Sequence, residues 1–191
     1  MQIETKGSGF LMQIHKNDKS VTKTIDTIAS DVVKYMVASG LTLCTAESCT
    51  GGMVSQYITS VAGASAMFLG GVCSYTEEIK QKILGVKKET LDRYTVYSEQ
   101  VASEMSAGAQ RLFASDCALG ITGIAGPGGV GDKPAGTVYI SARAHGREKV
   151  CTLKVFEQYE DPDREMVRRV SALTALQMLL EICKEADDKD K

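Results

Sequence analysis

The sequence contains 191 residues, of which 24 are acidic and 22 are basic, so the formal net charge at pH 7 is −2. A chain of this length is expected to fold as one compact domain with a substantial core. The balanced charge lacks the basic footprint of a nucleic-acid-binding protein, and no apolar run reaches the length of a membrane span. We therefore expect a soluble cytoplasmic protein that binds neither nucleic acid nor a membrane.

Cysteine and histidine are placed in ways that argue against disulfides and metal sites. The six cysteines are scattered and form no C-x-x-C pair, which favours buried, reduced thiols over a disulfide framework. The two histidines, His15 and His145, do not stand in a metal-ligand spacing. We accordingly expect no metal site.

The chain begins with a polar segment and a helix. Residues 1–19 lack periodicity, so we expect a poorly ordered extension followed by a single domain over residues 20–187. Apolar residues then recur at helical spacing, which predicts a helix capped by Ser20 or Thr22. The pair Ser39-Gly40 is expected to end this helix.

Strands and helices alternate after this first helix. Residues 41–45 are predicted to form a buried strand that leads through a turn at Ser48 into a helix ending near Val61. A second strand is expected at residues 68–75, where small and β-branched residues predominate. A strand, helix, strand order of this kind is typical of parallel pairing.

The middle of the chain continues the alternation. A short helix is predicted to begin at Thr76 or Glu77, and a further short helical piece is expected at residues 86–91. Ser98 is expected to cap a longer helix. A third, fully buried strand is predicted at residues 117–121, and it leads directly into a glycine-rich loop.

The C-terminal part is predicted to contain a hairpin and a last helix. Segments 136–144 and 149–156 flank the turn residues His145-Gly146. Asp161 as N-cap and Pro162 as first residue are expected to begin the last helix. The fold class predicted is therefore α/β: a three-layer sandwich with a mixed, mostly parallel sheet, helices on both faces and an antiparallel hairpin near the C-terminus.

A candidate site lies in the segment Thr-Ala-Glu-Ser48-Cys-Thr-Gly-Gly, at the predicted strand-to-helix turn. Free backbone N–H groups and the helix dipole favour negative charge there. Ser48 is therefore a candidate nucleophile or anion ligand, although serine is also a common structural helix cap. Cys49 is an alternative nucleophile, but such a cysteine needs a histidine base, and His145 is poorly placed.

The glycine-rich loop of residues 122–131 is the second candidate. Gly126-x4-Gly131 is followed by Asp132-Lys133, one residue out of register for a Walker A motif, and the next element is a strand. We therefore exclude a P-loop NTPase. The loop still fits a surface of backbone amides that bind a phosphate or another anion, or else it is merely a permissive connection.

The third candidate is Tyr75-x4-Lys80, whose spacing differs from the Tyr-x3-Lys pair of short-chain dehydrogenases. A lysine at the start of a helix is usually a solvated surface charge. If the strands that precede Ser48 and Tyr75 are neighbours, however, Ser48 and Lys80 meet above the same edge of the sheet.

These motifs together resemble the CinA C-terminal domain family over roughly residues 22–183. The resemblance rests on four separated motifs in the family's order: the Ser48 segment, the strand ending in Tyr75 with Lys80 after it, Val96-Tyr97-Ser98-Glu99, and Thr122-Gly-Ile-Ala-Gly-Pro with Lys133-Pro-Ala-Gly-Thr137-Val. It implies a stand-alone domain and a homodimer. It also implies a nicotinamide-nucleotide amidohydrolase, which converts nicotinamide mononucleotide (NMN) and water to nicotinate mononucleotide and ammonia without a cofactor.

The resemblance also implies roles for individual residues. Ser48 attacks the carboxamide carbon, Lys80 acts as general base, and Tyr75 assists in orientation or proton transfer. Backbone amides near Ser48 stabilise the oxyanion. The residues implied in substrate binding are Thr50, Gly51, Thr122, Gly123, Ala125, Gly126, Arg164 and Arg168, with Arg168 as the alternative to Arg164 in an entry to the last helix that is longer than the family's.

One departure from the family bears on activity, because Glu77 follows Thr76 where the family commonly has Asn. A lysine that acts as base near pH 7 needs its pKa lowered from about 10.4, a change of roughly 4 kcal/mol. A carboxylate close to Lys80 raises that pKa and opposes the role. Two alternatives therefore remain: a non-catalytic nucleotide-binding module, and an amidase for another small carboxamide.

Overall fold

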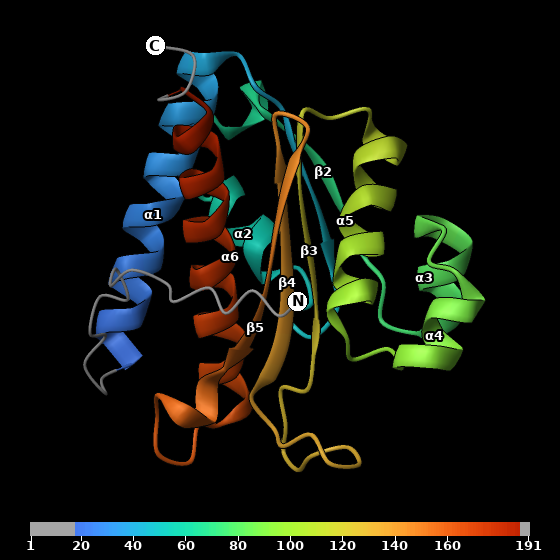
Figure 1. Cartoon of the computed structure of the whole chain (residues 1–191). Coiled ribbons are helices and arrows are strands. Elements are labelled where there is room, and N and C mark those ends of the chain that lie inside the picture. The colour runs from blue at the N-terminus through green and yellow to red at the C-terminus, as the bar shows by residue number, and fades with distance from the viewer. Residues whose placement is uncertain (1–17, 188–191) are drawn as a thin grey trace.

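The computed structural model describes residues 18–187 and shows a five-stranded sheet between two layers of helices (Figure 1). The strands lie in the order β2-β1-β3-β4-β5. Their bounds are β1 (Leu43–Glu47), β2 (Phe68–Cys73), β3 (Cys117–Gly123), β4 (Thr137–Ala144) and β5 (Arg147–Lys154). The predicted fold class is confirmed.

The sheet is mixed in the way that the strand order of the sequence predicts. β1 pairs in parallel with both β2 and β3, whereas β4 is antiparallel to β3 and to β5, so only β4 points the other way. Glu47, at the end of β1, is in register with Cys73 of β2 and Ile121 of β3. The carboxyl ends of the three parallel strands therefore meet at one edge, where ligands bind in open α/β sheets.

Helices cover both faces of this sheet (Figure 1). On one face lie α1 (Asp18–Ser39), α2 (Met53–Thr59) and α6 (Arg164–Asp187); on the other lie α3 (Glu77–Leu84), α4 (Lys88–Tyr94) and α5 (Glu99–Phe113). Short 3₁₀ turns occur at Ala64–Ala66 and Val155–Glu157. Among the residues that the structure describes, no helix combines the length and the apolar character needed to cross a membrane.

Helix α5 approaches the sheet closely because β3 contains Gly120. A Cβ atom at this position would collide with the carbonyl oxygen of Ala102 on α5. Side chains on this face of the sheet are fully buried, including Met105 of α5 and Ala118 of β3. α3 and α4 pack on the outer side of α5, so α5 connects them to the sheet.

Several predicted local signals are confirmed. The side-chain oxygens of Thr76 and Ser98 accept hydrogen bonds from the backbone N–H groups three residues on and so cap α3 and α5. His145 and Gly146 both have positive φ, as a two-residue turn between β4 and β5 requires. All six cysteines are free thiols.

The starts of the two long helices differ from expectation. α1 begins at Asp18, before Ser20 and Thr22, and the rest of the predicted extension lies outside the described residues. α6 begins at Arg164, not after Asp161, because the carboxylate of Asp163 accepts the N–H of Met166 at 2.7 Å and caps the helix. Asp161 has a φ of 48° and belongs to the preceding loop.

The bounds of β1 are also shifted by two residues from the predicted 41–45. The N–H of Leu41 donates to Met36 at the end of α1, and that of Thr42 donates to the carboxylate of Asp116. These bonds hold both residues outside the ladder. β1 consequently extends to Glu47 and carries Ser48 directly onto the edge of the sheet.

Candidate active site

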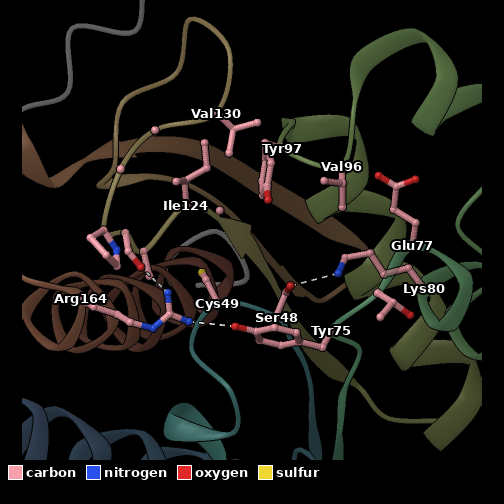
Figure 2. A pocket seen from close by; sticks show the side chains of 17 residues that line it. Ser48, Cys49, Tyr75, Glu77, Lys80, Val96, Tyr97, Ile124, Val130 and Arg164 are labelled. Carbon is pink, nitrogen blue, oxygen red and sulfur yellow. Dashed lines mark hydrogen bonds between the residues drawn. The ribbon is translucent and has the colours of Figure 1, made fainter.

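A pocket of about 440 Å³ lies at the edge of the sheet where the parallel strands end (Figure 2). This volume is typical of small-molecule sites. Five separate parts of the chain line it: the β1–α2 turn, the segment from Tyr75 into α3, the segment before α5, the loop after β3, and the first residue of α6. The lining residues are Ser48, Cys49, Tyr75, Thr76, Glu77, Lys80, Val96, Tyr97, residues 123–130 and Arg164.

Ser48 and Lys80 meet in this pocket, because β1 and β2 are neighbouring parallel strands. The Nζ atom of Lys80 lies 3.0 Å from Ser48 Oγ (Figure 2). It donates a second hydrogen bond, of 2.6 Å, to the carbonyl oxygen of Ser74. The N–H of Ser74 in turn donates to the carbonyl of Glu47. The lysine amine is therefore held directly against the serine hydroxyl.

The environment of Lys80 favours its neutral form. Its side chain is fully buried, and burial lowers the pKa of Lys80 from 10.5 to about 8. Cys49, Cys73 and Glu77 raise this pKa by smaller amounts, in that order. Glu77 therefore raises the pKa of Lys80, as expected, but burial lowers this pKa by more. An appreciable fraction of Lys80 is consequently uncharged near neutral pH.

The turn that carries Ser48 is held by Glu47, a residue whose role the sequence analysis missed. The buried Glu47 carboxylate accepts the N–H groups of Gly52 and Val54 at one oxygen, at 3.0 and 3.1 Å. Its other oxygen accepts the N–H and Oγ–H of Ser55, at 2.9 and 2.7 Å. Glu47 therefore caps α2 from the preceding strand. The one sequence signal for this role is the position of a glutamate just before the start of a helix.

Two backbone amides beside Ser48 have only the thiol of Cys49, a weak acceptor, as a partner among the described residues, so a ligand oxygen can replace it. The N–H of Gly51 donates to Ser48 and that of Gly52 to Glu47. Within residues 18–187, by contrast, no oxygen accepts the N–H groups of Cys49 and Thr50. Of the amides from Ser48 to Gly51 that are expected to bind the oxyanion, the N–H groups of Cys49 and Thr50 are therefore the candidates.

Cys49 is a poor candidate for the nucleophile. Its thiol is buried, and burial raises the pKa of Cys49 to about 12, so that the thiol stays protonated at neutral pH. The thiolate is the reactive form of cysteine. Ser48, which contacts a lysine of lowered pKa, is the stronger candidate.

Tyr75 and Arg164 form the wall of the pocket on the side of α6. The guanidinium of Arg164 donates through Nη2 to the Tyr75 hydroxyl at 2.8 Å and through Nη1 to the carbonyl of Gly126 (Figure 2). Both side chains are exposed. Arg164 thereby connects the end of β2 with the glycine-rich loop and keeps N–H groups for a ligand.

The loop after β3 presents backbone amides to the same pocket. Gly123, Ala125 and Gly126, for which the resemblance implies substrate binding, line it, and the loop is held by hydrogen bonds between Ile124 and residues 136 and 137. In the part of the chain that is described, no acceptor is found for the N–H groups of Ala125, Gly126, Gly128 and Gly129. Such an arrangement suits an anion.

The remaining residues expected to bind substrate do not line the pocket. Thr122 is buried and donates to the carbonyl of Val96. Arg168 donates to the carbonyl of Thr50 at 2.9 Å and pairs with Glu165, so it supports the Ser48 turn from α6. Thr50 is fully buried, and Gly51, with a φ of 61°, faces Arg168.

The fold and the site define an α/β protein with a small-molecule pocket at the carboxyl edge of its parallel strands. The chain belongs to the CinA C-terminal domain family, whose model matches residues 25–183. It is 42% identical over 152 residues to a CinA-like protein of Kosmotoga olearia, which covers 79% of this chain and 36% of that protein. It is 44% identical over 155 residues to one of Syntrophomonas wolfei, covering 81% and 36%. The chain thus spans little more than a third of these relatives.

Solved structures agree with this assignment. The chain resembles a CinA superfamily protein from Escherichia coli with a TM-score of 0.79 and 31% identity, covering 92% of this chain and 99% of that one. It resembles the competence/damage inducible protein CihA from Agrobacterium tumefaciens with a TM-score of 0.78 and 36% identity, covering 83% and 94%. The fold is therefore that of other CinA proteins.

Proposed function

We propose that this chain is an amidohydrolase that converts NMN and water to nicotinate mononucleotide and ammonia, with Ser48 as nucleophile. One observation carries the proposal: the buried amine of Lys80, with a pKa lowered to about 8, lies 3.0 Å from Ser48 Oγ in a ligand-sized pocket. Membership of the CinA C-terminal domain family supports it, because the characterised members that this sequence resembles are NMN deamidases.

In the first half of the reaction, neutral Lys80 accepts the proton of the Ser48 hydroxyl while Oγ bonds to the carboxamide carbon. The carbonyl oxygen becomes an oxyanion, for which the N–H groups of Cys49 and Thr50 are the available donors. The C–N bond then breaks, and the Lys80 ammonium returns its proton to the departing nitrogen. Ammonia leaves, and the acyl group stays on Ser48 as an ester.

In the second half, a water molecule attacks the ester carbon and Lys80 accepts its proton. The bond to Ser48 Oγ breaks, the proton returns to Oγ, and nicotinate mononucleotide is released. The hydrogen bond from Lys80 to the Ser74 carbonyl holds the amine in place in both halves. Lysine suits this cycle because burial makes both of its protonation states accessible near neutral pH.

We assign the phosphate of the nucleotide to the side of the pocket formed by Arg164 and the glycine-rich loop. Arg164 offers a guanidinium there, and the loop from Gly123 to Gly129 offers unpaired amides. Guanidinium and amide groups are the usual ligands of phosphate. Tyr75 positions Arg164 through the hydrogen bond at 2.8 Å, which is the orienting role that it has in this proposal.

The test is ammonia release from NMN by the purified protein, without added metal and with a chelator present. We expect release by the wild type and only background release by Ser48→Ala, with unchanged folding by circular dichroism. Ser60→Ala is the matched control, because Ser60 is an exposed serine just after α2 that does not line the pocket. It should retain wild-type activity.

The same assay separates the alternatives. Turnover by Ser48→Ala at a near-normal rate would remove Ser48 as nucleophile. A folded wild type that binds NMN but releases no ammonia would indicate a nucleotide-binding module, the function that the effect of Glu77 on Lys80 favours. Release from another small carboxamide, but not from NMN, would indicate a related amidase.

A further inference from the structure

Glu77 presents an unpaired carboxylate to the pocket. It is the first residue of α3, it is exposed, and it lines the pocket together with Val96 and Lys80. Across residues 18–187, no lysine or arginine forms an ion pair with this carboxylate, and no donor forms a hydrogen bond to it. The Gln81 side chain donates a hydrogen bond to the backbone carbonyl of Glu77, and in the described part of the chain it is the one side chain that does so.

The charges of the pocket are separated. Arg164 and Glu77 lie on opposite sides of Ser48 (Figure 2). Lys80 also lines the pocket, but it is uncharged when it acts as base. The reactive form of the site therefore has a positive end at Arg164 and a negative end at Glu77, with the nucleophile between them.

A ligand that matches this pocket has an anionic group at one end and a positive centre near its carboxamide. We propose that Glu77 is a specificity-determining residue that favours carboxamides on a cationic, pyridinium-type ring over the same ligands with a neutral ring. The identity of the substrate in this inference rests on the proposed function. Tyr97, which also lines the pocket, offers an aromatic ring to the same planar cation.

The same carboxylate has an opposing effect on the base. Its negative charge raises the pKa of Lys80 and so reduces the neutral fraction of the lysine at pH 7. Glu77→Gln should therefore weaken binding of a cationic ring while leaving kcat at pH 7 unchanged or higher. A rise in KM without a fall in kcat distinguishes recognition of charge from a structural role, which would lower kcat.

The binding test uses Ser48→Ala protein, so that NMN is not consumed, and compares NMN with its reduced dihydropyridine form, whose ring is neutral. Calorimetry should show that adding Glu77→Gln raises the Kd for NMN about three- to fivefold, the range of a solvent-exposed charge pair. The Kd for the reduced form should change less than twofold. Glu78→Gln, which removes the same charge from the neighbouring exposed residue outside the pocket, should change neither.

Two results would overturn the inference. One is an equal rise in the Kd of both ligands on Glu77→Gln, as expected if the carboxylate contacts the ribose that they share; the other is no change in either Kd. Should Glu77→Gln fail to fold, the preference of the Ser48→Ala protein for NMN over the reduced form is measured against salt. It should decline as salt screens the charges, and a preference that is absent or independent of salt also contradicts the inference. A preference of the expected kind, in a protein whose wild type releases no ammonia, would contradict the proposed function alone.

Discussion

In the reaction that we propose, Lys80 must be uncharged when it accepts the proton of Ser48. Lowering its pKa from 10.5 to about 8 corresponds to about 3 kcal/mol, supplied mainly by removal of the ammonium group from water. Its hydrogen bond to the Ser74 carbonyl and its contact with Ser48 Oγ keep the amine in place in either protonation state. Its environment thus matches the requirements of a general base near neutral pH.

This environment predicts a specific pH dependence. Because the base is active only when deprotonated, kcat/KM should rise about tenfold per pH unit below the pKa of Lys80 and level off above about pH 8. A pH–rate profile between pH 6 and 10 measures this limb. A flat profile from pH 6 to 9 would contradict the assignment of Lys80 as base.

Replacement of Lys80 tests the same point independently. Lys80→Ala should lower kcat by on the order of 100-fold or more, the usual contribution of a positioned base. Lys80→Arg should not restore activity, because a guanidinium remains protonated and cannot accept the proton of Ser48. Lys82→Ala, on the exposed side of the same helix, is the matched control and should retain activity.

At the scale of elements, the junction of β1 and α2 decides where Ser48 lies. The Glu47 carboxylate receives four hydrogen bonds, from the N–H groups of Gly52, Val54 and Ser55 and from the Ser55 hydroxyl. This glutamate takes the place that a serine or aspartate cap usually has. It acts from the end of the preceding strand, so it fastens helix and strand together and restrains Ser48 between them.

Glu47→Gln should therefore impair both stability and turnover. The amide has one oxygen, so two of the four donors lose their acceptor, which costs about 2–3 kcal/mol of unfolding free energy. We expect kcat to fall at least tenfold because Ser48 is less restrained. Urea unfolding and the ammonia assay measure the two effects, with Glu78→Gln as surface control. Wild-type stability in Glu47→Gln would show that the cap is dispensable.

Local sequence predicted the elements better than it predicted their ends. Thr76 and Ser98 are confirmed caps because each is the single capping residue at its helix start. Two aspartates compete before α6, and Asp163 caps it because Asp161 takes up a left-handed loop conformation. Such competition depends on how the loop packs, which periodicity does not describe.

At the scale of the whole molecule, α6 returns to the edge of the sheet and places two arginines near the turn that carries Ser48. Arg164 reaches the pocket and bonds Tyr75 and Gly126. Arg168, one turn further along, lies beneath the Ser48 turn and bonds the Thr50 carbonyl across 118 residues of sequence. The helix therefore lines the pocket with Arg164 and supports the turn that carries Ser48 with Arg168.

The two arginines should give opposite kinetic results. Arg164→Gln should raise KM for NMN at least tenfold, since a hydrogen bond to a charged group contributes about 1.5–3 kcal/mol. Arg168→Gln should lower stability and kcat with little change in KM, because it removes a support for the Thr50 carbonyl. Steady-state kinetics and thermal unfolding of both variants test this. A rise in KM for Arg168→Gln alone would assign the phosphate to Arg168.

The sequence by itself determined the class of fold, the order of strands and helices, and the segments around Ser48, Lys80 and the glycine-rich loop, because periodicity, caps and turn residues act over a few neighbours. Only the tertiary structure decided the burial of Lys80, which of Arg164 and Arg168 lines the pocket, and the hydrogen bonds of Glu47 to the start of α2. Each of these depends on desolvation and hydrogen bonds between groups brought together by sheet pairing and by the return of α6. The pairing of β1 with β2 that brings Lys80 to Ser48 also leaves Glu77 and Arg164 on opposite sides of Ser48.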